Sequence, residues 1–353
     1  MPRATVSADA PLGVTAVVVT YDSAQHVEGC LEALVAQDHP VGIVVVDNGS
    51  GDRSVELARR CAAEHPGRID VVPLATNTGF SAAVNRAIET SDADAVLLVN
   101  PDARLAGDHV GHLARALAAD GRLGSVQGTL WRPRRAGLPA RIDSTGHRAF
   151  VTRLFGNRDE GRTTPSPGGE VFGVTGAAAL HRRAMLDDIA VPRPDGSLEW
   201  LDETMFAYWD DVDLDWRARL RGWRAAHVPE AVGVHERGGA GARRSHFVEE
   251  CNAANRLLLL AKLDHRPSLA RVLPAVVLGT GLKLLWLGLT KPSVLPRVVR
   301  RVAQGWRPTM ERREHALATA MVNPATVVAG FESFDWRAWV RRWWDRVRSA
   351  AVD

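Results

Sequence analysis

The amino-acid sequence predicts an α/β protein whose mostly parallel sheet is flanked by helices. Two observations predict this class. Apolar, β-branched runs alternate with segments of helical spacing over about the first hundred residues, and clusters of polar residues directly follow the runs. The composition, 46% hydrophobic and 24% charged, is that of a globular protein and excludes a disordered or fibrous one. Three scattered cysteines are too few for a disulfide framework or a cysteine-based zinc site, so we expect reduced core thiols in a cytosolic protein.

The alternation defines the elements of the first part of the chain. The continuous apolar run of residues 14–20 suits a strand that is buried on both faces. In order, we predict strands at Val14–Thr20, Gly42–Asp47, Ile69–Leu74 and Ala95–Val99, with helices at Ala24–Gln37, from near Asp52, and at Ser81–Glu89. Strands that alternate with helices imply right-handed crossovers and parallel pairing. Ligands of such sheets bind at the carboxyl ends of the strands, which is where the polar clusters lie.

The rest of the chain divides less clearly. Residues 121–169 are rich in Arg, Gly and Pro, which predicts loops with short strands. A helix is predicted at Asp210–Arg221, with Val212, Trp216 and Leu220 as its buried stripe. Because the chain is long for one core, we expect three parts: a flexible tail at 1–13 without the pattern of a signal peptide, a main domain at 14–265, and a helical region at 266–353.

Two polar clusters have both a structural and a functional interpretation. Asp47-Asn48-Gly49-Ser50 is either a strand-ending turn in which Ser50 or Asp52 caps the next helix, or a site where Asp47 binds the base or ribose of a nucleoside. Residues 77–85 are either a capped helix start or a place where a glycine lets a ligand approach the backbone closely. The fingerprints of dinucleotide-binding folds and P-loops are absent from this segment.

Two further clusters are rich in carboxylates. Asn100-Pro101-Asp102 is either a turn or a hard-cation site, in which Asp102 holds Mg²⁺ or Mn²⁺ that also bridges a diphosphate. His235 is a candidate second ligand, although a lone histidine is more often structural. Four acids stand within the six residues Asp210–Asp215, more than the dipole of a helix start requires, and one of them can serve as a general base.

The order of these motifs resembles that of the family 2 inverting glycosyltransferases of GT-A fold. It runs from Thr20-Tyr21 through DNGS, NTGF, NPD and GAAAL to DDVDL-x-WR, and the resemblance covers about Val14 to His265. More narrowly, residues 142–146 (IDSTG) and 171–180 look like bacterial rhamnosyltransferases of the cell-wall-linker type. The resemblance implies a nucleotide-sugar donor such as dTDP-rhamnose, a polyprenyl-linked or glycan acceptor, Mg²⁺ or Mn²⁺, and a single displacement that inverts the sugar.

The resemblance also implies roles for individual residues. Thr20, Tyr21, Asp47 and Asn48 would line the nucleoside pocket, with Asn77, Gly79, Phe80 and Asn85 near the ribose and diphosphate. Asp102 stands where the D-x-D motif of the family has its metal-binding Asp, and Asn100 replaces the first acid of that motif. Asp211 would be the catalytic base, with Asp210 in place of the usual Glu, while Gly176 and Ala177 would form a tight wall beneath the sugar and acceptor.

The C-terminal region differs from the rest in charge. Residues 266–353 carry a net charge of +9 and 6 of the 11 tryptophans, against −6 for residues 1–265. The apolar stretch 272–289 approaches spanning length but contains Pro274, glycines and Lys283, so we expect an interfacial helix pair rather than a span. Residues 334–344 alternate aromatic and basic side chains. We therefore predict a peripheral protein on the cytoplasmic, anionic face of the plasma membrane that binds no nucleic acid. A helical cap packed on the main domain is the alternative.

Two other functions stay open at this point. A sugar-nucleotide nucleotidyltransferase would form the donor rather than consume it, but the basic glycine-rich loop of such enzymes is absent at residues 20–23. A non-catalytic membrane adaptor could keep the fold without binding a nucleotide diphosphate.

Overall fold

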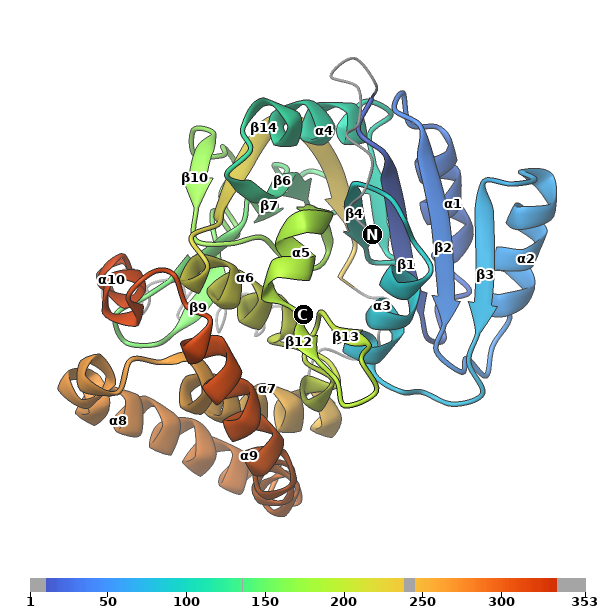
Figure 1. Cartoon of the computed structure of the whole chain (residues 1–353). Coiled ribbons are helices and arrows are strands. Elements are labelled where there is room, and N and C mark those ends of the chain that lie inside the picture. The colour runs from blue at the N-terminus through green and yellow to red at the C-terminus, as the bar shows by residue number, and fades with distance from the viewer. Residues whose placement is uncertain (1–10, 135, 238–244, 335–353) are drawn as a thin grey trace.

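The computed structural model describes residues 11–134, 136–237 and 245–334. A twisted central sheet is covered by helices, and three long helices pack together beside it at the C-terminal end of the described chain (Figure 1). Most of the expected tail at 1–13 and all but the first residue of the aromatic and basic segment 334–344 lie outside the described residues.

The first half of the sheet confirms the predicted alternation. Strands β1 (Val14–Thr20), β2 (Val41–Asp47), β3 (Ile69–Pro73) and β4 (Ala95–Val99) are parallel, in the spatial order β4-β1-β2-β3. The crossovers contain α1 (Val27–Val35), α2 (Ser54–Glu64) and α3 (Phe80–Glu89). Parallel register places Thr20 beside Asp47 at the carboxyl edge of the sheet. Helix α1 is shorter than predicted, because a turn occupies the residues before Val27.

The second half of the sheet is mixed. Strand β11 (Ala178–Arg182) is antiparallel to both β4 and β6 (Leu123–Trp131), and β14 (Arg224–His235) is parallel to β6. Three short strands, β5 (Ala103–Leu105), β7 (Ile142–Ser144) and β10 (Gly169–Val171), pair with these longer ones.

The prediction of only loops and short strands for residues 121–169 is wrong for β6, which is a nine-residue strand inside the sheet. Its buried side chains include Ser125, Gln127 and Thr129, so its sequence lacks an apolar run. The Gln127 side-chain oxygen accepts a hydrogen bond of 2.7 Å from the backbone N–H of Thr175, and the Thr129 hydroxyl lies 2.9 Å from a ring nitrogen of His227. Polar partners on neighbouring strands thus replace the apolar contacts that a sequence pattern would show.

The remaining elements cover the sheet and build its polar edge. They are α4 (His109–Ala119), the hairpin β8 (His147–Ala149) and β9 (Phe155–Asn157), α5 (Arg183–Ile189), the hairpin β12 (Val191–Pro192) and β13 (Leu198–Glu199), the 3-10 turn η1 (Glu203–Met205), and helices α6 (Asp210–Leu220), α7 (His246–Leu263), α8 (Arg266–Thr290), α9 (Val294–Ala318) and α10 (Pro324–Ala329). The predicted stripe of α6, Val212, Trp216 and Leu220, is buried in one cluster with Leu259 of α7. All three cysteines are buried and unpaired, as expected for core thiols.

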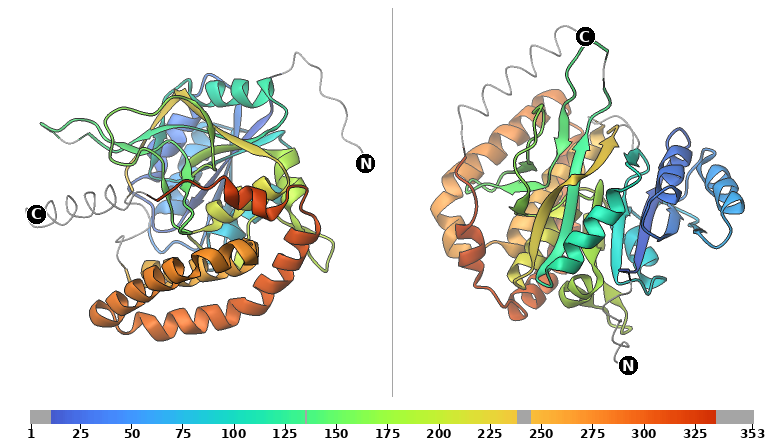
Figure 2. Two further views of the ribbon diagram at one scale, coloured as in Figure 1. Left: turned by 90° about the vertical axis from the view of Figure 1, so that its left-hand side faces the viewer. Right: turned by 90° about the horizontal axis from the view of Figure 1, so that it is seen from above.

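Residues 272–289 form part of one continuous helix, α8, so the expectation of a helix pair in this stretch is wrong. The helix accommodates Pro274 without a break. Its length and mean hydropathy of 1.8 would allow it to cross a membrane, and only 11% of its most apolar window is buried. Helix α9 packs alongside both α7 and α8 (Figure 2), so helices on the two sides of the predicted boundary at residue 265 are in contact.

Candidate active site

The carboxyl edge of β1 and β2 forms a tightly bonded corner. The Thr20 hydroxyl donates to Asp47 Oδ1 over 2.8 Å, and the backbone N–H of Ser50 donates to Asp47 Oδ2 over 3.0 Å. Asp47 is 1% exposed, whereas Tyr21, the next residue after β1, is 44% exposed. The corner therefore presents the Tyr21 ring to solvent and keeps the Asp47 carboxylate in a fixed orientation behind it.

A second loop lies against this corner. The Asn48 side chain donates to Asn77 Oδ1 over 3.1 Å and accepts from the backbone N–H of Thr78 over 2.8 Å. Asn77 Oδ1 also accepts from the N–H of Gly79, over 3.0 Å. Gly79 has a φ of +92°, and a Cβ there would lie 2.7 Å from the carbonyl oxygen of Phe206. This glycine thus permits α3 to begin in contact with the loop that precedes α6.

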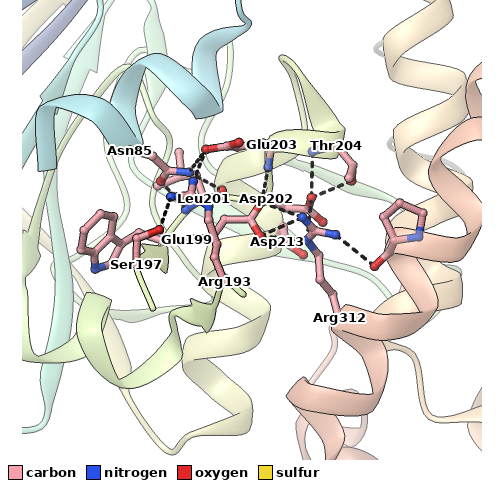
Figure 3. A network of polar contacts seen from close by, with 12 residues as sticks. Asn85, Arg193, Ser197, Glu199, Leu201, Asp202, Glu203, Thr204, Asp213 and Arg312 are labelled. Carbon is pink, nitrogen blue, oxygen red and sulfur yellow. Dashed lines mark hydrogen bonds and ion pairs between the residues drawn. The ribbon is translucent and has the colours of Figure 1, made fainter. Parts of the chain in front are cut away.

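Phe80 and Asn85 on α3 both contact that later loop. The N–H of Phe80 donates to the carbonyl of Phe206 over 2.6 Å. The Asn85 amide donates to the carbonyl of Leu201 over 2.8 Å and to Glu203 over 2.9 Å, and its oxygen accepts from the N–H of Leu201 (Figure 3). Asn85 is 1% exposed, so in this structure it positions residues 201–203, and its role near a ribose or diphosphate stays a prediction.

The loop before α6 has an unusual backbone. Phe206, Tyr208 and Trp209 have positive φ values of 62°, 69° and 72°, a conformation that costs free energy in residues with side chains. Asn255 of α7 compensates by donating to the carbonyls of Met205, Ala207 and Tyr208 over 2.7, 3.0 and 2.9 Å. A buried amide of the C-terminal helices therefore fixes the turn that leads into the acidic cluster.

Asp211 emerges from this turn as a partly exposed carboxylate. Its Oδ2 accepts a hydrogen bond of 3.1 Å from the backbone N–H of Gly176, and its side chain is 28% exposed. The neighbouring Asp210 is buried. Burial, and after it the charge of Asp211, raises the pKa of Asp210 to well above that of an ordinary Asp. Of the two acids, only Asp211 is placed to receive a proton from a molecule in solution.

His147 is a site residue that the sequence reasoning missed. Its Nδ1 lies 2.7 Å from Asp215 Oδ2, and its Nε2 lies 3.5 Å from Asp211 Oδ2. Burial lowers the pKa of His147, but the carboxylates of Asp211 and Asp215 outweigh this effect and raise it. A Cβ on Gly173 would overlap the Asp215 carboxylate, so this arrangement needs a glycine there. The feature of the sequence that points to His147 is its position directly after the IDSTG motif.

Asp102, in the turn between β4 and β5, lies beside His235, the last residue of β14, at a candidate cation site. His235 Nε2 lies 3.3 Å from Asp102 Oδ1, and its Nδ1 lies 2.8 Å from Asp143 Oδ2. Burial lowers the pKa of His235, but the two carboxylates outweigh it and raise that pKa to about 9. Asn100 is joined to the neighbouring strand by a backbone hydrogen bond of 2.9 Å to the carbonyl of Ala177.

The donor set at this position fits Mn²⁺ or Mg²⁺. A carboxylate oxygen and an imidazole nitrogen face each other, and a second carboxylate orients the ring through its other nitrogen, as is common for metal-binding histidines. Asp143 is in turn paired with Arg132 and Arg237. Within the described part of the chain, no group of three or more His, Cys, Asp or Glu side chains is arranged to hold a metal ion by itself. Asp102 and His235 would thus be the protein ligands, with further positions left for a diphosphate.

Comparison with known proteins agrees with this geometry. Residues 15–190 match the family model described as glycosyl transferase family 2. The chain belongs to glycosyltransferase family 2. This assignment favours the glycosyltransferase hypothesis over a nucleotidyltransferase or an adaptor.

Two curated relatives of this family 2 glycosyltransferase have named activities. It is 29% identical over 247 residues to the N-acetylglucosaminyl-diphospho-decaprenol L-rhamnosyltransferase of Mycobacterium tuberculosis. The aligned region covers 63% of this chain and 75% of that protein. It is 27% identical over 276 residues to an N-acetylglucosaminyltransferase of a Rhizobium species. That aligned region covers 74% of this chain and 56% of the relative.

Solved structures confirm the GT-A fold. A mannosyltransferase of Pyrobaculum calidifontis, in complex with GDP-Man and Mn²⁺, superposes with a TM-score of 0.51 at 22% identity, covering 91% of this chain and 85% of that one. GalNAc-T7 with UDP, GalNAc and Mn²⁺ superposes with a TM-score of 0.55 at 11% identity, covering 71% and 48%. As a member of glycosyltransferase family 2, the protein is a nucleotide-sugar-dependent enzyme.

Proposed function

We propose that this enzyme transfers L-rhamnose from dTDP-rhamnose to a hydroxyl of a lipid-linked glycan, with Asp211 as the general base. The observation that carries the proposal is the Asp211 carboxylate itself. It is partly exposed, held by the N–H of Gly176, and faces His147 at the carboxyl edge of the sheet. The named activity of the mycobacterial relative supports the choice of sugar and of acceptor.

The proposed reaction is a single displacement. Asp211 accepts the proton of the acceptor hydroxyl, whose oxygen then forms a bond to the anomeric carbon of the sugar. The bond from that carbon to the diphosphate breaks on the opposite side, and the nucleoside diphosphate leaves with the electron pair, so the configuration inverts. His147, held by Asp215, is a positioning residue that keeps the Asp211 carboxylate oriented.

The donor would lie across the carboxyl edge of the sheet. We assign the nucleoside to Thr20, Tyr21, Asp47 and Asn48, and the ribose, diphosphate and sugar to the region of Asn77, Gly79, Phe80, Asn100, Gly176 and Ala177. Mg²⁺ or Mn²⁺, when bound by Asp102 and His235, would neutralise negative charge on the departing diphosphate. Thr20 and Asp47 are the last residues of parallel strands, and Tyr21, Asn48 and Asn100 directly follow such strands, which is where a parallel sheet offers polar groups to ligands.

The proposed location is the cytoplasmic face of the plasma membrane. Helix α8 exposes large apolar side chains, among them Leu278, Leu282 and Leu285. The net charge of +9 over residues 266–353 would favour an anionic lipid surface. A lipid-linked acceptor would be available at that surface.

The proposal is tested with the full chain, Mn²⁺, a synthetic N-acetylglucosaminyl-diphospho-lipid and a panel of nucleotide sugars. We expect dTDP-rhamnose to give a glycosylated product by mass spectrometry, and Asp211→Asn to lower kcat by about 10²–10⁴-fold. Asp195→Asn, in the exposed turn between β12 and β13, is the control and should leave kcat unchanged. Preference for another donor would refute the rhamnosyl assignment, and full activity of Asp211→Asn would refute the assigned base.

A further inference from the structure

A cavity of about 520 Å³ lies between helices α7 and α9 and the turn η1. Most of its lining comes from α9, and the remaining two residues come from η1 and α7. The lining residues are Thr204, Glu250, Arg297, Arg300, Arg301, Gln304 and Gly305, and we call this cavity the arginine pocket. It contains none of the residues assigned above to the donor, the base or the metal.

The arginine pocket has an excess of positive charge. Arg301 is paired with Glu250 over 2.9 Å, so its charge is balanced. Arg297 and Arg300 are exposed, and no ion pair joins either of them to another residue in the described ranges. Three arginines and one glutamate give the lining a net charge of +2. Two guanidinium groups without a carboxylate partner are suited to bind phosphate oxygens in pairs.

One wall of the pocket contacts the loop that leads to Asp211. The Arg301 guanidinium lies over the rings of Phe206 and Phe247, at 5.9 and 5.6 Å from their centroids. The carbonyl of Phe206 is the group that meets Phe80 and Gly79 at the start of α3. Thr204, in the pocket lining, stands in the same segment that leads to Asp211. An anion in the pocket would therefore be adjacent to the loop that carries the base.

The other neighbour of the pocket is apolar. The C-terminal half of α8 exposes Leu282, Leu285, Trp286 and Leu289, and residues 291–293 connect it directly to α9. Leu287 of α8 packs against Val294 and Val298 of α9, which fixes the two helices side by side (Figure 2). The first turns of α9 thus bring Arg297 and Arg300 close to an uncovered hydrocarbon-like surface.

We propose that the arginine pocket binds the diphosphate of a lipid-linked acceptor, whose hydrocarbon chain lies along α8. The proposal rests on the proposed function and names the site that would hold its acceptor. The net charge of +2 matches the two negative charges that a diphosphate diester carries near neutral pH. The apolar helix beside the pocket distinguishes this ligand from a free nucleotide diphosphate, which has no hydrocarbon chain to bury.

The test measures binding by calorimetry with the full chain and farnesyl diphosphate as the probe, because this short lipid diphosphate is soluble. Inorganic diphosphate, farnesol and vesicles of phosphatidylcholine with phosphatidylglycerol are the comparison ligands. The variant is Arg297→Gln/Arg300→Gln, and Arg307→Gln, an exposed arginine of the same helix outside the pocket, is its matched control. Thermal unfolding verifies that both variants fold.

We expect farnesyl diphosphate to bind more tightly than inorganic diphosphate or farnesol, and the double variant to bind it at least tenfold more weakly, while Arg307→Gln binds it normally. Equal binding by the double variant and the wild type would overturn the proposal. So would an equal loss in Arg307→Gln, since that result means a general attraction of the basic helix to anionic ligands.

Loss of nucleotide diphosphate binding in the folded double variant would also overturn the proposal, because the pocket would then belong to the donor. The binding assay needs no sugar transfer. A failed transfer assay with arginine-dependent binding intact would count against the proposed sugar donor and acceptor and leave the pocket in place.

Discussion

Substitution of Lys262 by Met should destabilise the protein more than any loss of a surface ion pair. Lys262 is 1% exposed and joins two buried carboxylates, at 2.6 Å from Asp202 Oδ2 and 2.5 Å from Asp213 Oδ1. Each carboxylate has one further cationic partner: Arg312 lies 3.2 Å from Asp202 (Figure 3), and Arg217 lies 2.8 Å from Asp213. The variant would therefore leave two buried negative charges with one arginine each.

The expected loss of unfolding free energy follows from the number of arginines that remain beside the two carboxylates. Removing one member of a buried ion pair costs about 3–5 kcal/mol when the other charge is left without compensation. Because Arg312 and Arg217 remain, we expect a loss near the lower end, about 3 kcal/mol. The measurement is urea unfolding followed by tryptophan fluorescence, in which the midpoint should fall while the slope stays constant.

A matched control removes a cation from an exposed pair. The side chains of Arg307 and Glu311 on α9 are 91% and 63% exposed, so Arg307→Met should cost about 0–1 kcal/mol. If Lys262→Met were as stable as Arg307→Met, the network around Lys262 would not stabilise the fold, and the reasoning would fail. The double variant Lys262→Met/Asp202→Asn, which removes one of the unbalanced charges, should recover part of the loss.

Three further predictions concern the site and its pH dependence. His147→Gln should lower kcat about tenfold while KM for the donor stays nearly unchanged, because it removes the ring that orients the Asp211 carboxylate; a rise in KM with kcat unchanged would contradict this role. Gly79→Ala should cost about 1–3 kcal/mol in urea unfolding, through its φ of +92° and its contact with Phe206, and a cost below 0.5 kcal/mol would contradict this. Burial raises the pKa of Asp202, but Lys262 and Arg312 outweigh it and hold that pKa well below its usual range. The ionised Asp202 carboxylate therefore contributes its full stabilisation above about pH 4, and this contribution is lost as the pH falls further. In unfolding measured at about pH 7, 4 and 3, the free energy of unfolding should fall less in Asp202→Asn than in the wild type.

The sequence predicts the parts of this fold that depend on local pattern. Strands β1 and β4 are continuous apolar runs because both of their faces are buried, and the stripe of α6 repeats at helical spacing. Strand β6 has no such signal, since polar partners on other strands satisfy its buried side chains. For α8, Pro274 and its glycines predicted a break, yet a proline removes only one hydrogen bond and the helix continues.

In the candidate site, too, residues that belong to a local sequence motif can be predicted, whereas contacts between distant parts of the chain cannot. Asp211 can be proposed as a base from the sequence alone because acids crowd the start of one helix and its motif lies in one segment. His147 cannot be found in this way, because its partner Asp215 is 68 residues away and a single histidine carries no pattern. Asn85 was assigned from its motif, but the direction of its side chain depends on how residues 201–203 fold back onto α3.

The three carbonyls bound by Asn255 have a consequence for anyone who wishes to re-engineer the enzyme. The turn before Asp211 has its unusual backbone only while α7 supplies that amide, and α7 is itself packed against α9. Exchange of the C-terminal helices between related enzymes would also exchange the amide that holds the turn before Asp211. The C-terminal helices and the turn before Asp211 are therefore one structural unit, which a chimera should transfer as a whole.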